Sequence, residues 1–176
     1  MVLLVGEARG ELTVGGSAGG LVPLSDLDPT VVVGVEAGWS RGAFGAGVII
    51  DAAQPATDGQ AGDASWSLRV RELRVALVGR VVWPDLALRP FAAAGPALLF
   101  VETRENGTLG GERFGVAVES DVAPGLLFSA GVEADLGPGA LFGAAVLGLA
   151  AFDGTLTGEA SAATLDLRLG YRFRLP

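Results

Sequence analysis

Apolar and polar residues alternate with a period of two at both ends of the chain. Across residues 2–14 the even positions are small or apolar, and the odd positions 7–13 carry Glu, Arg, Glu and Thr. Residues 165–175 repeat the alternation with the opposite parity, so that the odd positions are apolar and most even positions are Asp or Arg. Successive side chains of a strand point to opposite faces, so this period predicts strands with one apolar and one charged face.

The same alternation recurs between these ends and predicts about eight strands. We expect them over residues 2–14, 30–40, 44–52, 66–83, 91–103, 119–135, 140–152 and 165–175. In the fourth segment the parity changes near Arg71 and Glu72, and a β-bulge would reconcile the two halves. Phe91 and Phe100 also have opposite parity, so one of them faces inward unless Pro96 marks a second bulge.

The connections between these segments alternate in length. Short turns are expected near residues 40–42, 84–85 and 137–139, and longer polar links near residues 16–29, 53–65, 104–113 and 153–162. A meander with short turns at one end and long loops at the other is typical of outer-membrane barrels. We therefore predict an all-β fold, a closed antiparallel up-and-down transmembrane β-barrel of about eight strands, as a single domain over residues 1–176.

Composition narrows the possible classes of protein. Half of the residues are hydrophobic, the mean hydropathy is +0.49 and only 18% of residues are charged, below the roughly 25% of soluble domains. No apolar run reaches the ~18 residues that a membrane-spanning helix needs. The chain has no Cys and no His, which excludes disulfides and zinc sites built from these residues, and we expect no metal and no cofactor. The net charge of -8 argues against nucleic acid as a partner.

Aromatic residues cluster at the two ends of the expected strands. Such clusters are typical of the aromatic girdles that lie at the two membrane–water interfaces of a barrel. The expected membrane-interface aromatics are Trp39, Phe44, Trp66, Trp83, Phe91, Phe142, Phe152, Tyr171 and Phe173.

Three stretches resemble the small outer-membrane β-barrel superfamily, the OmpA-, OmpX- and OmpW-type eight-stranded barrels. Residues 88–95 (LRPFAAAG) are similar to the start of a central strand, and residues 129–136 (SAGVEADL) to a strand before a periplasmic turn. Residues 165–173 (LDLRLGYRF) resemble the C-terminal strand that the barrel-assembly machinery reads. The resemblance implies a porin-like protein of the cell envelope, located in the outer membrane of a Gram-negative bacterium. No signal peptide is visible, so we expect the mature form of an exported protein.

Charged residues on the polar face are the candidates for the barrel lumen. They are Glu7, Arg9, Glu11, Glu36, Arg69, Arg71, Glu72, Arg74, Arg80, Glu133, Asp135, Asp166, Arg168 and Arg172. Eight strands leave an interior just wide enough for side chains to fill, where Arg would pair with carboxylates. We interpret this set as a structural salt-bridge plug, and a gated ion path is the alternative. Small residues such as Ala92, Ala94, Gly143 and Ala145 could line an apolar wall of the lumen.

Catalysis is not expected. The superfamily includes acyltransferases and deacylases that act on lipid A, and these rely on an active-site His that this chain lacks. The acidic pairs Glu7/Glu11 and Glu133/Asp135 follow from strand alternation and have abundant Arg neighbours. We assign no catalytic residue and expect no enzyme.

Three functions remain open from the sequence. The first is a structural outer-membrane barrel that presents its loops. The second is a conduit or binder for small hydrophobic molecules through an apolar part of the lumen, and the third is a soluble lipocalin-like ligand-binding barrel. Alternation does not say which face is outside, but the aromatic clusters and low charge favour lipid. The expected partners are membrane lipid or lipopolysaccharide, the barrel-assembly machinery, and an envelope protein that the sequence does not identify.

Overall fold

The computed structural model describes residues 10–83, 86–151 and 161–175, and all regular structure in them is β. The strands are β1 (Glu11–Pro23), β2 (Thr30–Arg41), β3 (Phe44–Ala53), β4 (Ala56–Ala61), β5 (Ala64–Val82), β6 (Arg89–Leu109), β7 (Glu112–Leu136), β8 (Gly139–Ala151) and β9 (Ser161–Leu175). The described residues contain no helix long and apolar enough to cross a membrane.

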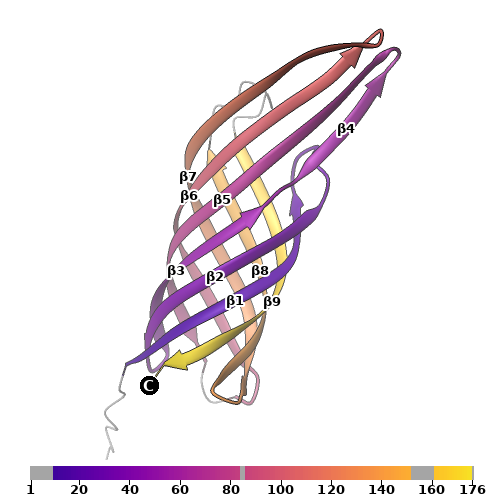
Figure 1. The fold of residues 1–176 in the computed structure, drawn as a ribbon. Coiled ribbons are helices and arrows are strands. Elements are labelled where there is room, and N and C mark those ends of the chain that lie inside the picture. The colour runs from indigo at the N-terminus through magenta and orange to yellow at the C-terminus, as the bar shows by residue number, and fades with distance from the viewer. Residues whose placement is uncertain (1–9, 84–85, 152–160, 176) are drawn as a thin grey trace, which may run out of the picture.

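The strands form one closed antiparallel barrel (Figure 1). Strands β3 and β4 both pair with β5 and not with each other. Every other strand pairs with its neighbours in sequence, and β1 pairs with β9 to close the cylinder. Strands β3 and β4 pair with β5 in one continuous register, because Ala53 lies opposite Glu72 and Ala56 lies opposite Arg69. They therefore act as one barrel strand interrupted at residues 54–55. The predicted eight-stranded up-and-down barrel is confirmed.

Three of the predicted long polar links contain strand. The link expected at residues 16–29 is strand as far as Pro23, because β1 begins at Glu11 and runs further than predicted. Two other links are strands joined by tight turns. Strand β6 ends at Leu109 and strand β7 begins at Glu112. The turn between them consists of Gly110 and Gly111, whose φ angles are 60° and 87°. Strand β4 and the first part of β5 likewise fill most of the expected link at residues 53–65. Sequence reasoning missed these strands because both of their faces are rich in polar residues, so the apolar period disappears. The link expected at 153–162 lies almost entirely outside the described residues.

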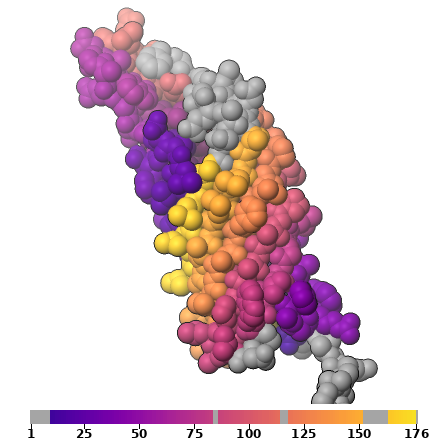
Figure 2. All heavy atoms as spheres, turned by 180° about the vertical axis from the view of Figure 1, so that it is seen from behind, coloured from indigo at the N-terminus to yellow at the C-terminus, as the bar shows by residue number. Residues whose placement is uncertain are grey.

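These extra strand lengths build an extension on one side of the barrel. The upper parts of β4, β5, β6 and β7 rise beyond the neighbouring strands as a twisted sheet (Figure 1). From behind, the same extension projects above β8 and β9 (Figure 2). We call this part, residues 56–70 and 103–121, the β4–β7 extension.

The bulge predicted near Arg71 is wrong. Strand β5 pairs with β6 in one register from Ala64 to Val82, so no residue is inserted near Arg71. The alternation changes there because the outward residues of β5 become charged while the inward Val70 is apolar and buried. Pro96 also lies within a continuous register, so Phe91 faces inward and Phe100 outward. Among the described residues, the register between β6 and β7 shifts at Glu105/Gly107 instead.

The outside of the barrel is apolar and the inside is charged. Large hydrophobic side chains such as Leu77, Leu167 and Leu169 are exposed on the outer face. Buried positions on the inner face include Asp166 and Arg168, with relative exposures of 0% and 6%. A soluble lipocalin-like barrel requires the reverse arrangement, so the structure contradicts that alternative.

Candidate functional site: the charged interior

The inner wall of the barrel has a small-residue half and a large-residue half. Inward positions on β1, β2 and β3 are mostly Gly, Ser and Thr, whereas β5 to β9 contribute Arg, Glu and Phe. Long side chains from one half therefore extend across the bore toward backbone on the other half. Their polar ends meet in three groups, each with two Arg and two carboxylates.

The upper quartet consists of Asp51 on β3, Arg74 on β5, and Asp166 and Arg168 on β9. Arg74 Nη2 lies 2.7 Å from Asp166 Oδ2 and 3.2 Å from Asp51 Oδ2. Arg168 donates to Asp51 Oδ2 at 3.0 Å and also contacts Asp166. All four side chains are at most 8% exposed, so each charge depends on its partners rather than on water.

Glycine makes the space that this quartet occupies. A Cβ added at Gly148 would lie 2.0 Å from Arg74 Nη1, and one at Gly34 would lie 2.4 Å from Asp51 Oδ1. Both side chains are held by ion pairs and have little freedom to move aside. The two glycines are therefore part of the site, and the sequence offers no signal for them because Gly is scattered along the whole chain.

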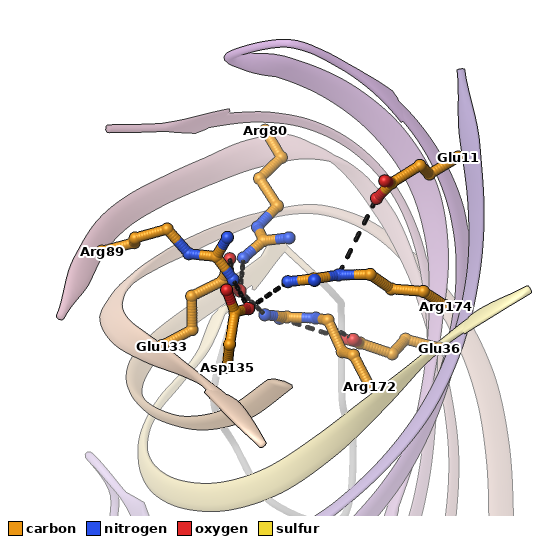
Figure 3. Close-up of polar contacts among 8 residues, drawn as sticks. All are labelled: Glu11, Glu36, Arg80, Arg89, Glu133, Asp135, Arg172 and Arg174. Carbon is orange, nitrogen blue, oxygen red and sulfur yellow. Dashed lines mark hydrogen bonds and ion pairs between the residues drawn. The ribbon is translucent and has the colours of Figure 1, made fainter. Parts of the chain in front are cut away.

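The middle quartet consists of Glu36 on β2, Arg80 on β5, Glu133 on β7 and Arg172 on β9 (Figure 3). Arg172 Nη1 lies 2.9 Å from Glu133 Oε2, and Arg172 Nη2 lies 3.2 Å from Glu36 Oε2. Arg80 contacts the same Glu133 Oε2. Glu133 thus accepts from two guanidinium groups, as a carboxylate with four lone-pair sites can.

Two buried aromatic rings support the middle quartet. The guanidinium carbon of Arg172 lies 3.9 Å from the centre of the Phe142 ring and 4.9 Å from that of Phe91. Arg80 lies 4.5 Å from the Phe91 ring, and the two rings meet edge to face at 6.3 Å. These contacts give the guanidinium groups cation–π partners as well as carboxylates.

The lower quartet lies at the short-turn end and consists of Glu11 on β1, Arg89 on β6, Asp135 on β7 and Arg174 on β9 (Figure 3). Arg89 and Arg174 both contact Asp135 Oδ1, and Arg174 Nε lies 3.8 Å from Glu11 Oε2. Arg89 also reaches Glu133 Oε1 at 3.2 Å, which joins this quartet to the middle one. The Asp135 side chain is 58% exposed, so water screens this quartet more than the other two.

Charge balance holds within every quartet, because two guanidinium groups face two carboxylates at each level.

A cavity of about 70 Å³ lies between the upper and middle quartets, with Ile49, Val78 and Phe142 in its lining. A water molecule takes about 30 Å³ in the liquid, so this space holds only a few waters.

The structure distributes the predicted lumen residues in four ways. Glu11, Glu36, Arg74, Arg80, Glu133, Asp135, Asp166, Arg168 and Arg172 belong to the quartets. Glu72 is half-buried on the inner side without joining one. Arg69 and Arg71 lie on the outer face instead, because β5 has no bulge to turn them inward. Glu7 and Arg9 lie outside the described residues.

Three quartet members were not among the predicted candidates. Asp51 stands alone in an apolar strand, and its signal is that it shares the inward parity of Ile49. Arg89 precedes Pro90 at a strand start, where periodicity is weak. Arg174 continues the even, charged positions of the last strand, which is a signal that could have found it.

The predicted interface aromatics also separate by position. Trp39, Phe44, Trp83 and Phe173 are exposed near the short-turn end, and the outward Tyr171 donates from its hydroxyl to the Leu136 carbonyl at 2.5 Å. Phe91 and Phe142 are instead buried inside, because inward parity places them beside the Arg side chains. Trp66 lies in the β4–β7 extension, against Gly59 on the inner side of the sheet. Phe152 lies outside the described residues.

The expected apolar wall of the lumen faces outward. Ala92, Ala94 and Ala145 line a shallow hollow on the outer face, beside Leu147 and Leu165. Gly143 lines a neighbouring outer hollow with Leu167 and Leu169. The sequence could not separate the two faces of β6 and β8 because Ala and Gly occur on both.

Fold and interior together define a class: the chain has the fold of the small eight-stranded outer-membrane barrels. It is similar to the outer membrane protein OprG of Pseudomonas aeruginosa, with a TM-score of 0.62, 12% identity and coverage of 96% of this chain and 97% of that one. A major outer membrane protein of Thermus thermophilus matches with a TM-score of 0.62, 14% identity and coverage of 95% and 100%. Neisserial surface protein A matches with a TM-score of 0.57, 14% identity and coverage of 94% and 97%. No protein-family model and no curated protein sequence matches the chain.

Proposed function

We propose that this protein is an integral outer-membrane barrel of the bacterial cell envelope, with a closed interior, that holds the β4–β7 extension at the membrane surface. The three charge-balanced quartets that cross the bore are the observation that carries the proposal. The partners that we propose are membrane lipid or lipopolysaccharide around the barrel and the barrel-assembly machinery during biogenesis.

An uncharged belt of the right height supports the membrane position. The outward residues of β5 are apolar or Gly from Leu73 to Val81, and the exposed Trp83 follows them. This span of 11 positions agrees with the ~9–11 residues of a transmembrane strand. The matching outward positions of β6, from Pro90 to Phe100, are also uncharged. The long-strand end would face outward, because outer-membrane barrels carry their longer connections on the external side.

Energetics support a closed interior. An ion that enters the upper quartet must separate Arg74 or Arg168 from carboxylates that it contacts at hydrogen-bond distance. A buried charge that loses its partner costs about 3–5 kcal/mol. The quartets have no net charge, so they also provide no excess of one sign to attract a permeating ion.

The same pairing supports a non-catalytic role. Every carboxylate in the upper and middle quartets contacts between one and three guanidinium groups, so its oxygens are already engaged and are not placed to take a proton from a substrate. The cavity of about 70 Å³ is far below the ~300–1,000 Å³ of small-molecule sites. A larger space of about 500 Å³ opens at the short-turn end, but its lining includes Arg80, Glu133 and Arg172. The small inner cavity and the charged lining of the mouth both argue against the alternative of a conduit or binder for hydrophobic molecules inside the lumen.

Conductance across a planar bilayer tests the proposal. We expect no steady conductance from the intact protein. We expect channels from the variant Glu36→Ser/Asp51→Ser/Arg168→Ser/Arg172→Ser, which removes equal positive and negative charge from two quartets. The control Ser65→Ala/Thr108→Ala removes a hydroxyl contact of 2.8 Å in the β4–β7 extension and should stay silent. All proteins are first shown to be folded barrels by a heat-dependent shift in gel mobility. Steady conductance of the intact protein would contradict the closed interior, and the absence of a heat-dependent shift would contradict the membrane barrel.

A further inference from the structure

Four charged side chains lie on the outer face of the barrel directly above the uncharged belt. Arg69 and Arg71 on β5 face outward, and their direct partners across the β5–β6 ladder are Arg104 and Glu102. All four are solvent-accessible: the Arg71 and Arg104 side chains are 59% and 48% exposed, and that of Glu102 is 35% exposed. These positions are one and two outward steps beyond Leu73 and Phe100.

Positive charge is in excess in this group. Glu102 Oε1 lies 2.7 Å from Arg104 Nε and 3.7 Å from Arg71 Nη1, so one carboxylate serves two guanidinium groups. Arg69 makes no ion pair or hydrogen bond from its side chain within the described residues. Three Arg and one Glu leave two positive charges, and Arg69 lies directly opposite Arg104, a like-charge arrangement that destabilises a strand pair. An anion between these two side chains would remove that repulsion.

The direct cross-strand partners on the neighbouring strands supply no such anion. Opposite Arg104 and Glu102 on β7 lie Val118 and Ser120, and opposite Arg69 on β4 lies Ala56. The next outward residue of β4, Asp58, lies opposite Ser67 and diagonally across from Arg69. Within the described residues it makes no ion pair with Arg69, so the excess of positive charge lies on β5 and β6 at the upper edge of the belt. This local excess stands out in a chain whose net charge is -8.

We propose that Arg69, Arg71 and Arg104 bind the phosphate of a membrane lipid headgroup. Side chains directly opposite on paired strands have Cβ atoms about 4.5–5.5 Å apart, so two guanidinium forks can hold one phosphate from both sides. Guanidinium matches phosphate geometry with paired hydrogen bonds. The site faces sideways at the level where lipid headgroups begin, which selects a lipid phosphate over a soluble anion. This inference rests on the proposed membrane position.

Binding of phosphorylated lipid in neutral detergent micelles tests the site. The probes are lipid A and phosphatidylglycerol, each titrated against the refolded protein and followed by native mass spectrometry, with inorganic phosphate as competitor. We expect Arg69→Gln/Arg104→Gln to weaken lipid binding at least about tenfold, since the change removes the charge-assisted hydrogen bonds of two guanidinium groups to the phosphate. Arg113→Gln removes an exposed Arg higher in the β4–β7 extension and should leave binding unchanged.

The outcomes separate this site from the membrane proposal. Weaker binding by the double variant, with an unchanged heat-dependent gel shift, supports the site. Equal binding by the intact protein and the double variant overturns it, even though the barrel remains folded. Displacement of the lipid by inorganic phosphate at equal concentration would also overturn it, because the ligand would then be a soluble anion. Loss of the gel shift in the intact protein would instead contradict the proposed function.

Discussion

Arg172 lies over the ring of Phe142, with its guanidinium carbon 3.9 Å from the ring centre. The aromatic ring is 4% exposed and faces the bore, although its place near a short turn predicts a membrane-interface position. A guanidinium between ring and carboxylates is held in one orientation, which lets it bridge Glu36 and Glu133.

Phe142→Leu should therefore destabilise the barrel more than an aromatic change on its outer face. We expect a loss of about 1–3 kcal/mol from lost packing and cation–π attraction. Phe44→Leu, at an exposed outer position, is the control and should change stability by about 0.5 kcal/mol or less. Urea unfolding in detergent micelles measures both. Equal destabilisation by the two changes would mean that the ring contributes nothing specific to the middle quartet.

Gly148→Ala should also destabilise the protein, because the added methyl group would lie 2.0 Å from Arg74 Nη1. Arg74 is bound to Asp51, Thr164 and Asp166, so moving it breaks buried contacts. We expect a cost of about 1–3 kcal/mol, as for other overpacked interiors. Gly20→Ala makes the same chemical change where no atom lies within 4 Å and should be nearly neutral. If both variants unfold at the same urea concentration, the upper quartet is not as tightly packed as the structure has it.

Removing one charge from the upper quartet should cost more than removing a neutral pair. Asp166→Asn leaves Arg74 and Arg168 with one carboxylate between them, and we expect a loss of about 3–5 kcal/mol. Asp166→Leu/Arg168→Met removes both signs and replaces them with apolar side chains, so its cost should be smaller. Unfolding free energies of both variants in the same detergent give the comparison. A double variant less stable than the single one would contradict the view that charge balance, rather than polarity, stabilises this level.

The three Trp residues should report different surroundings. Trp39 and Trp83 are exposed at the belt, whereas Trp66 lies in the β4–β7 extension, seven residues beyond Leu73 along β5. In single-Trp variants reconstituted in bilayers, brominated lipid chains should quench Trp39 and Trp83 strongly. Trp66 should instead be quenched by aqueous acrylamide. Strong quenching of Trp66 by brominated lipid would place the extension in the membrane and contradict the proposed belt.

Sequence periodicity predicted the strands in which one face is uniform. Residues 165–175 alternate cleanly, and every inward charge there takes the expected side. Periodicity failed where the surroundings of a strand change along its length. On β5 the outward side passes from lipid at Leu73 to water at Arg71, so the polar face changes sides without any change in backbone register.

The candidate site could be predicted only in part, for the same physical reason. Alternation assigns a residue to a face, but it does not say which residues from distant strands meet across the bore. The pairing of Asp51 with Arg168 joins residues 117 positions apart, and only the stagger of the closed barrel sets that contact. Phe142 lies among small residues on both faces of β8, so its inward orientation has no periodic signal.

Closure of the barrel by β9 has a kinetic consequence. Strand β9 pairs with β1, whose residues lie about 150 positions away in the chain, and it supplies both Asp166 and Arg168 to the upper quartet. Asp51 and Arg74 are direct partners across β3 and β5 and pair with each other before that strand arrives, but the middle quartet then lacks Arg172 and keeps two carboxylates for one Arg. Contacts of such long sequence separation slow folding. We therefore expect the barrel to gain much of its stability in a late step, when β9 pairs with β1 and β8 and completes all three quartets.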